Sequence, residues 1–420
     1  MTNLIDIFSL YKIFWQIFLE FWWVVLPFPL WYLFKFIWKD YVIEYAKDAW
    51  LNHLEWTVLE IIPPKNTEKS PKVMEAIYAG IAGVVASINP FDEWLKGAFT
   101  DQFSLEIVGE EGTIHFYIRT QKKFRNLIEA QIYAQFPDAE IFEIPDYVNK
   151  FPKIIPNKNW DLWGSDLEFK MPDPYPIKTY DKFEEDVTGT IIDPLAAMAE
   201  VIGKLGPGQH IWLQHVILPL PETWRNEELK LINKLAKKAE KKEKNLLEHM
   251  AEVVANFPKA FVGPIEFAAN EPEKDQPVEF KLTPGEKEVL KAVEENLGRN
   301  AFKTKMRLLV FGRKEVFDKT LVSSFFGSLK QFSDLNLNNL KPNDVSKTYA
   351  NYIMKKSRLE ARQRKIYRRY KSRSMDGALM VFSTKELATL FHFPNMEVKA
   401  PSVTMIQSKR GTAPSNLPIE

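Results

Sequence analysis

The longest apolar stretch of the chain lies near its N-terminus. Seventeen of the 21 residues from 14 to 34 are apolar or aromatic, and Glu20 is the one charged side chain among them. An α-helix of this length rises about 30 Å, the thickness of the hydrocarbon core of a bilayer. The pattern therefore predicts an N-terminal transmembrane helix, within a membrane anchor at residues 1–39 whose partner is membrane lipid.

Aromatic residues and prolines refine this prediction. Indole rings favour the bilayer interface, and five tryptophans are candidate anchor residues: Trp15, Trp22, Trp23, Trp31 and Trp38. Pro27 and Pro29 interrupt the run, so a re-entrant hairpin with halves at 13–26 and 30–38 is an alternative to a single span. A helix buried in a large core is a second alternative. Lysines that follow the run favour a cell-membrane protein whose body is cytoplasmic.

Residues 40–150 show a regular alternation of strand and helix patterns. Alternating apolar positions indicate strands, and apolar positions three or four apart indicate helices. The expected order is strand 57–64, helix 69–88, two strands within 103–120, helix 122–137 and strand 139–147. This βαββαβ order is typical of a ferredoxin-like domain.

The remainder predicts a second domain of the same kind. Residues 151–166 read as a linker, and residues 167–384 show strand and helix patterns that can form another ferredoxin-like βαββαβ set. Charged helical segments would interrupt this set as insertions at 222–300 and 342–375. Residues 385–420 read as an extended tail. The predicted fold class is α+β, with two ferredoxin-like domains after the transmembrane helix.

Few residues offer catalytic or metal chemistry. The chain has no cysteine, which excludes disulfides, thiol catalysis and cysteine-bound zinc. No P-loop motif and no G-x-S-x-G motif occur. His210 and His215 lie five residues apart on one predicted strand, so they face opposite sides of it and do not form a metal pair. We therefore predict a protein that is not an enzyme, with no cofactor, no metal site and no evident small-molecule substrate.

The C-terminal part carries the strongest charge signal. Residues 301–420 contain 23 basic and 9 acidic side chains, and residues 355–374 contain ten Lys or Arg against Glu360. Apolar residues recur there at helical spacing, so one side of a helix packs while the other presents cations. The candidate residues for DNA or another anionic partner are Arg362, Arg364, Arg368, Arg369, Lys371 and Arg373. DNA phosphates, anionic lipid and an acidic protein face all remain open, as does a helix whose cations meet carboxylates of the same molecule.

An apolar segment precedes the Pro-rich end of the chain. Within residues 385–393 the large apolar side chains are Leu387, Leu390, Phe391 and Phe393. The segment has the composition of a peptide that docks on a partner, and packing on its own domain is the alternative.

Several blocks of this sequence resemble an uncharacterised family of membrane-anchored proteins of candidate-phyla bacteria (Patescibacteria). They include WWVVLPFPL, SLEIVGEEGTIHFYIRT and WDLWGSDLEFKMPDPYPIKTY. The segment from Met380 to Pro418 is similar to the region that precedes the motor domain in ATPases of the type IV secretion and conjugation coupling type. In those relatives a P-loop domain follows, whereas this sequence ends at Glu420.

The resemblance implies a non-enzymatic, membrane-anchored scaffold of a type IV secretion-like or conjugation-like translocation system. Such a scaffold would dock a separate P-loop ATPase through the basic helix or the tail. The alternative is a membrane-tethered nucleic-acid-binding protein that contacts DNA phosphates through residues 355–374.

Overall fold

The computed structural model describes residues 26–38, 54–64, 69–84, 101–183, 193–235 and 283–394, with a few positions before residue 21. The chain separates into two compact units. One contains residues 1–56 and 86–101, and the other contains residues 57–85 and 102–420.

Helix α2 (Pro27–Ile37), in the first unit, does not support the predicted anchor. It has 11 residues, which rise about 16 Å, roughly half of a hydrocarbon core. Pro27 begins this helix because the first helical position needs no amide hydrogen. Among the described residues, none of the helices combines the length and the apolar character that a bilayer crossing requires. This finding contradicts the predicted transmembrane helix and the cell-membrane location, whereas membrane lipid as a partner stays a prediction.

The five candidate anchor tryptophans are only partly described. Trp15 and Trp31 are about half exposed, at 48% and 57%, and Trp38 is half-buried. Trp31 stacks on Phe34 of the same helix, with ring centroids 6.1 Å apart. Trp22 and Trp23 lie outside the described residues.

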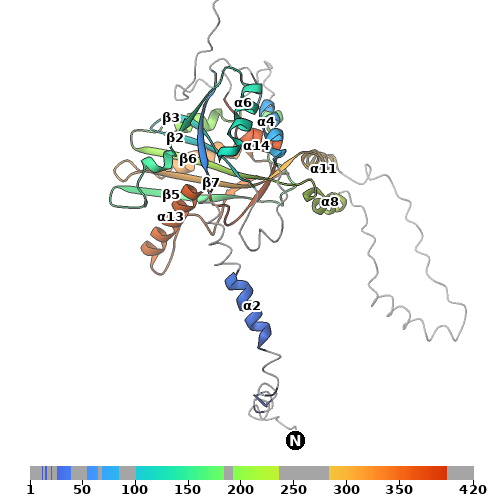
Figure 1. The fold of residues 1–420 in the computed structure, drawn as a ribbon, viewed down its shortest axis with the longest axis vertical. Helices are drawn as coiled ribbons and strands as arrows, with labels where there is room; N and C mark the ends of the chain where they lie inside the picture. Colours follow the sequence, from blue (N-terminus) through green and yellow to red (C-terminus); the bar gives the residue numbers. More distant parts are fainter. Residues whose placement is uncertain are drawn as a thin grey trace, which may run out of the picture. The chain divides into compact units, whose positions relative to one another are not determined.

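A nine-stranded sheet forms the centre of the second unit in the part of the chain that the structure describes (Figure 1). Its strands are β1 (Trp56–Ile62), β2 (Phe103–Glu110), β3 (Thr113–Gln121), β4 (Glu140–Ile144), β5 (Trp160–Phe169), β6 (Gln209–Pro219), β7 (Ala301–Arg313), β8 (Leu340–Pro342) and β9 (Met380–Ser383). The order is β4-β1-β3-β2-β6-β7-β5-β8, and β9 also pairs with β7. The four central strands β2, β6, β7 and β5 are antiparallel to their neighbours.

The prediction of two ferredoxin-like domains is wrong, because strands of both predicted domains belong to this one sheet. Strand β2 pairs with β6 over eight residues, from Phe103 opposite Ile217 to Glu110 opposite His210. Both strands are buried along nearly their whole length, as strands in the middle of a covered sheet are. The α+β class and most of the expected elements are present, but the predicted linker 151–166 contains much of β5.

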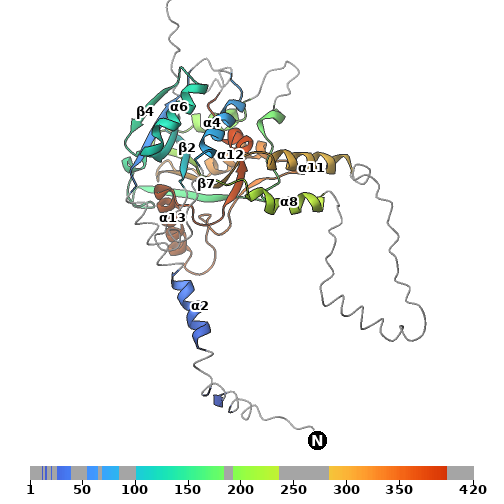
Figure 2. The same ribbon diagram turned by 45° about the vertical axis from the view of Figure 1, so that its right-hand side comes forward.

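Helices cover both faces of the sheet (Figure 2). Five of them contribute buried residues to the larger apolar core on one face: α4 (Lys72–Ala82), α6 (Arg125–Gln135), α7 (Ala196–Gly203), α12 (Thr320–Leu329) and α14 (Thr384–Leu390). Helix α13 (Lys355–Ser372) packs on the opposite face, in a second core. The position of α13 makes this second face the one that carries the candidate site.

The predicted insertions contain helices. Helix α8 (Trp224–Leu235) and helix α11 (Pro284–Leu297) lie within 222–300 and share a small apolar cluster. Helix α11 begins with a capping box between Thr283 and Glu286. The insertion predicted at 342–375 contains α13. Short 3-10 helices complete the described elements: η2 (Lys122–Phe124), η3 (Tyr147–Lys150), η4 (Tyr180–Phe183) and η6 (Lys330–Phe332).

Candidate functional site

Helix α13 lies on the sheet through one narrow apolar stripe. Its buried residues are Gln363, Ile366, Tyr367 and Tyr370, which occupy positions i, i+3, i+4 and i+7 of the helix, as one face of a helix requires. The stripe contacts the second core, which includes Leu162, Trp212 and Phe311. A Cβ on Gly164 of β5 would approach Ile366 to 3.1 Å, so glycine there permits the close approach of helix and strand. The apolar stripe therefore fixes which side of α13 faces solvent.

The C-terminal end of α13 is attached to the sheet by Arg373. This residue follows the helix in the left-handed conformation, at φ 54°, where glycine is usual. Its guanidinium binds Asp146 through Nη1–Oδ2 and Nη2–Oδ1 distances of 2.6 and 2.8 Å. It also binds Glu106 through Nε–Oε1 and Nη2–Oε2 distances of 3.0 and 3.2 Å. Two bidentate pairs offset the conformational cost of a side chain at this position.

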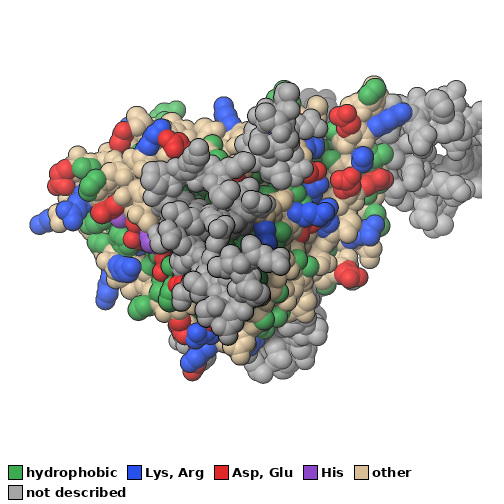
Figure 3. Space-filling view, turned by 90° about the horizontal axis from the view of Figure 1, so that it is seen from above, with side chains coloured by type: hydrophobic (Ala, Val, Ile, Leu, Met, Phe, Trp, Pro, Cys, Tyr) green, Lys and Arg blue, Asp and Glu red, His purple; other side chains and the backbone are tan. Residues whose placement is uncertain are grey.

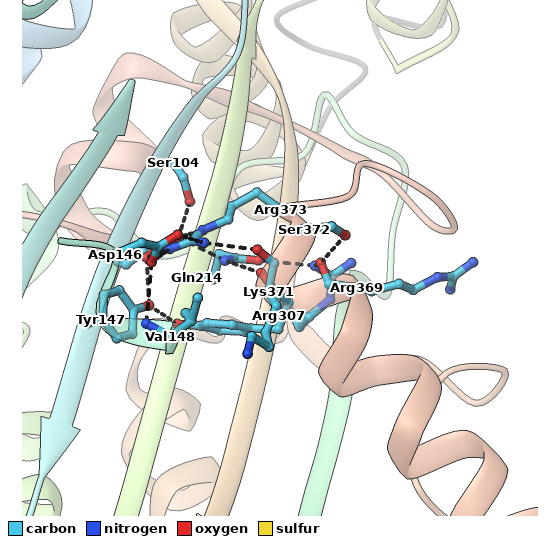
Figure 4. Close-up of polar contacts among 12 residues, drawn as sticks. Ser104, Asp146, Tyr147, Val148, Gln214, Arg307, Arg369, Lys371, Ser372 and Arg373 are labelled. Atoms are coloured by element: carbon cyan, nitrogen blue, oxygen red, sulfur yellow. Dashed lines mark hydrogen bonds and ion pairs between the residues drawn. The ribbon is translucent and has the colours of Figure 1, made fainter. Parts of the chain in front are cut away.

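Glu106, in the middle of β2, is the centre of this network. Figure 4 shows its partners Ser104, Tyr147, Gln214 and Arg373 close together. Its carboxylate also accepts hydrogen bonds from Ser104 (2.6 Å), Tyr147 (2.6 Å) and Gln214 (2.9 Å). Burial alone would raise the pKa of Glu106. The charge of Arg373 and these hydrogen bonds outweigh burial and lower that pKa to about 2. Glu106 is therefore ionised at neutral pH although it is fully buried.

A second ion cluster lies beside the first. Asp166 of β5 accepts a hydrogen bond from Arg307 Nε at 2.9 Å, and its other oxygen lies 3.1 Å from Lys305 Nζ. All three side chains are buried to 1% exposure or less. Burial, opposed by Asp166, lowers the pKa of Lys305 to about 8. Arg307 also donates to Gln214 at 3.1 Å and to the carbonyl of Arg369 at 2.9 Å. It thereby joins the two clusters to the last turn of α13.

Strand register explains why these residues meet. Glu106 lies opposite Gln214, Gln214 opposite Arg307, and Arg307 opposite Asp166. Residues directly opposite one another point to the same face of a sheet. One polar row thus crosses four strands beneath α13. Because its charges are paired and buried, the row positions the helix and is not itself a binding surface.

The solvent side of α13 is strongly cationic. Its exposed cations are Lys355, Lys356, Arg358, Arg364, Lys365 and Arg368. Arg364 lies 3.5 Å from Glu360. Within the described ranges, none of Lys355, Lys356, Lys365 and Arg368 has a carboxylate within 4 Å. By contrast, acidic and basic side chains are interspersed over the described atoms of the face in Figure 3. The side of α13 opposite the sheet is therefore an unbalanced positive surface.

The structure separates the six predicted anion-binding residues into three groups. Arg364 and Arg368 are exposed, as predicted. Arg362, Arg369 and Lys371 are half-buried, and Arg362 donates to the backbone carbonyl of Lys347 at 3.3 Å. Arg373 is buried and paired with two carboxylates. Including Arg373 among the anion-binding residues is therefore wrong, because its charge is already neutralised inside the protein.

The predicted docking residues are core residues. Leu387 and Leu390 lie in α14, followed by Phe391 and Phe393, and all four are exposed by 2% or less. Phe391 and Phe393 pack edge-on against Phe116 of β3. The structure contradicts a docking role for these four side chains and agrees with the alternative, packing on their own domain.

The two strand histidines point to opposite faces, as predicted. His210 stacks on Phe311 beneath the α13 face, whereas His215 contacts Phe391 on the other. Burial lowers the pKa of each to about 4, so both are neutral at neutral pH. Among the described residues, no group of three or more His, Asp or Glu side chains is arranged to hold a metal ion.

Comparison with known proteins gives one family. A family model described as a domain of unknown function, DUF8128, matches residues 40–405. The chain belongs to the DUF8128 family. No curated protein matches it. The DUF8128 match includes every strand of the sheet and all of α13, so the sheet and its cationic helix belong to the same domain.

Sequence reasoning missed the buried row of this DUF8128 domain. Alternating Lys303, Lys305 and Arg307 on a strand of otherwise apolar residues is the available signal. A strand buried on both faces accepts such cations only when carboxylates on neighbouring strands pair with them. Lys303 is exposed, whereas Lys305 and Arg307 pair with Asp166 on β5, which lies about 140 residues away in the sequence, and only the strand order brings it close.

Proposed function

We propose that this DUF8128 protein binds nucleic acid through the solvent side of α13, by contacts to phosphates. The observation that carries the proposal is the asymmetry between its cations. Arg307 and Arg373 are buried and paired with carboxylates, whereas the exposed cations of α13, Arg364 apart, have no carboxylate partner among the residues that the structure describes. A helix held in place by its other side presents such charges at fixed positions, as binding to a phosphate backbone requires.

The arrangement favours phosphate contacts over base reading. Lys365 and Arg368 project from the same side of α13 as Arg358 and Arg364, along about three turns of helix. Long cationic side chains at this spacing follow a phosphate backbone, and phosphate contacts carry no sequence information. The proposal therefore includes strong salt dependence and little sequence preference.

The scaffold hypothesis, with a separate P-loop ATPase of a secretion or conjugation system as partner, stays a prediction. Its docking route through Leu387 to Phe393 uses side chains that are in the core. Among the described residues, the docking route that this hypothesis still has is the cationic side of α13. An acidic protein surface would also fit there. Nucleic acid is favoured because Arg358, Arg364, Lys365 and Arg368 all lie on the solvent side of one helix, opposite its buried residues.

Fluorescence anisotropy with labelled oligonucleotides at several salt concentrations tests the proposal. The test variant reverses four exposed charges of α13: Lys356→Glu, Arg364→Glu, Lys365→Glu and Arg368→Glu. We expect the wild-type protein to bind with a steep salt dependence. The variant should lose at least roughly tenfold in affinity at low salt, and its slope of log K against log salt should be flatter by about 3.

A second variant controls for net charge. It carries Lys287→Glu, Lys291→Glu, Lys314→Glu and Lys319→Glu, which reverse the same number of exposed cations outside α13. This control should bind nearly as well as wild type. Equal losses in both variants, or wild-type binding that does not respond to salt, would refute the proposal.

A further inference from the structure

The segment that precedes α13, residues 343–354, is built on the free edge of β5. The Asn343 amide donates to the carbonyl of Asp166, and the Asp166 amide donates to Ser346 Oγ, each at 2.9 Å. The Thr348 amide donates to the carbonyl of Gly164, and the Gly164 amide donates back to Thr348 Oγ1, again at 2.9 Å. The base of this 343–354 loop thus covers an edge that would otherwise expose unpaired backbone groups.

Arginines of α13 hold the other side of the 343–354 loop. Arg362 donates from one Nη to the carbonyls of Lys347 and Tyr349, at 3.3 and 2.5 Å. Arg358 donates to the carbonyl of Asn351 at 3.1 Å. The loop is therefore attached to both the sheet and the helix, and its tip is presented in a defined place.

The tip exposes large side chains that have no place in the core. Tyr349 is 54% exposed, Tyr352 89%, Ile353 80% and Met354 71%. Tyr352 and Met354 have positive φ angles of 65° and 52°, a conformation uncommon for side chains of this size. Such strain persists where surrounding contacts enforce it, and it occurs most often at functional sites.

One cation lies beside an exposed ring, and others follow the tip in sequence. Lys347 Nζ lies 5.7 Å from the centre of the Tyr349 ring and also pairs with Asp344 at the surface. Lys355, Lys356 and Arg358 are exposed and follow the tip within four residues. Exposed aromatic rings among cations are the combination that binds single strands, because an unpaired base offers a face for stacking while its phosphate meets the cation. A duplex keeps those base faces inside its own stack.

We infer that the 343–354 loop binds single-stranded nucleic acid, with unpaired bases stacked on Tyr349 and Tyr352 and phosphates held by the cations of α13. This inference rests on the proposed function and adds the class of substrate. DNA and RNA share this chemistry, so both are included in the test.

The test compares three labelled probes by anisotropy: a 20-nucleotide oligo-dT, a 20-nucleotide oligo-U and a 20-base-pair duplex. We expect wild type to prefer a single strand over the duplex at equal salt. Tyr349→Ala combined with Tyr352→Ala should weaken binding of the single strand on the order of 10- to 100-fold. Binding of the duplex should change less than about twofold, and the ratio for oligo-dT and oligo-U identifies the favoured nucleic acid.

Matched variants separate stacking from folding. Tyr349→Phe with Tyr352→Phe keeps the rings and should bind like wild type. Tyr133→Ala removes a 41% exposed ring on α6 and should have no effect. Melting curves of the alanine variant should match wild type, because both side chains point largely into solvent.

The outcomes distinguish the two proposals. Two outcomes would overturn only the stacking inference. In the first, the charge reversals abolish salt-dependent binding but the tyrosine-to-alanine substitutions leave it unchanged. In the second, the wild-type protein prefers the duplex. Absence of binding to all three probes at low salt would overturn the proposed function as well. Poly-glutamate binding as tightly as oligo-dT would assign the surface to an acidic protein and overturn both.

Discussion

Lys305 and Arg307 both contact Asp166, but they contribute differently to stability. Arg307 also donates to Gln214 and to the carbonyls of Arg369 and Ser374. Lys305 has Asp166 and the carbonyl of Ala378 as its partners. One carboxylate thus faces two buried cations. Burying a charge costs free energy that pairing repays only with good geometry, so Lys305 is the less favourable of the two.

Replacing each cation by methionine tests this difference. Lys305→Met should leave the free energy of unfolding at pH 7 unchanged or higher, because Asp166 keeps Arg307. Arg307→Met should lower it by about 3 kcal/mol or more, since a buried carboxylate and several acceptors lose their donor. Urea unfolding measures both. An equal loss in the two variants would contradict this assignment.

The pH dependence of the free energy of unfolding gives an independent test of the role of Lys305. Burial lowers the pKa of Lys305 from its ordinary value of 10.5 to about 8 in the folded protein. Between these values the unfolded chain binds the proton more tightly, so wild-type stability should rise as the pH increases from 8 to about 10.5. Lys305→Met should lack this rise.

At the scale of elements, the attachment of α13 depends on the charge of Glu106. Its folded pKa of about 2 lies below the ordinary value of 4.5. This carboxylate therefore stabilises the fold fully above about pH 4.5, and the contribution is lost as the pH falls towards 2. Glu106→Gln should cost on the order of 3 kcal/mol at pH 7.

Urea unfolding of wild type and Glu106→Gln between pH 7 and 2.5 measures this contribution. The gap between the two proteins should shrink steadily below about pH 4.5. Glu200→Gln, at an exposed pair with Lys204, serves as the control and should change stability by less than about 1 kcal/mol. A gap that stays constant with pH would exclude the ionised Glu106 as the group that attaches α13.

Local patterns predicted the elements well and the residues of the site only in part. The amphipathic spacing of α13 and the β2–β3 hairpin around Glu111-Gly112 follow from neighbours in sequence. The role of Arg373 cannot be predicted from neighbours in sequence. Its partners Glu106 and Asp146 lie on β2 and on the segment after β4, more than 220 residues earlier. A basic run predicts a cationic helix but not which of its arginines turns inward.

Pairings between strands that are distant in sequence could not be predicted from local patterns either. An edge strand shows polar or charged positions, whereas β2 is buried at seven of its eight positions. That continuous burial is the physical signature of a central strand, but the sequence hides it, because residues 103–109 read FSLEIVG and the polar Ser104 and Glu106 give them the alternation of a half-exposed strand. The prediction of a closed first domain overlooked it because a βαββαβ order gives no information about what lies beyond its edge.

At the scale of the whole molecule, the β2–β6 pairing makes the two halves of the sheet depend on each other. The halves are also linked across the layers, since Tyr78 of α4 donates a hydrogen bond to the carbonyl of Phe391 at 2.7 Å. Separating them would expose an eight-residue edge that is buried at seven positions in the intact sheet and would remove Phe391 and Phe393 from the core around Phe116. Such an edge pairs with whatever strand it meets.

Residues 54–158 expressed alone should therefore aggregate or remain unfolded, although they contain every element of the predicted first domain. Co-expressed with residues 159–394, they should be recovered as a complex that pairs β2 with β6. Size-exclusion chromatography and circular dichroism of both preparations measure this. A monomeric 54–158 fragment with a cooperative melting transition would mean that the β2–β6 pairing joins two independent domains, and that the single sheet is a consequence of docking and not a condition for folding.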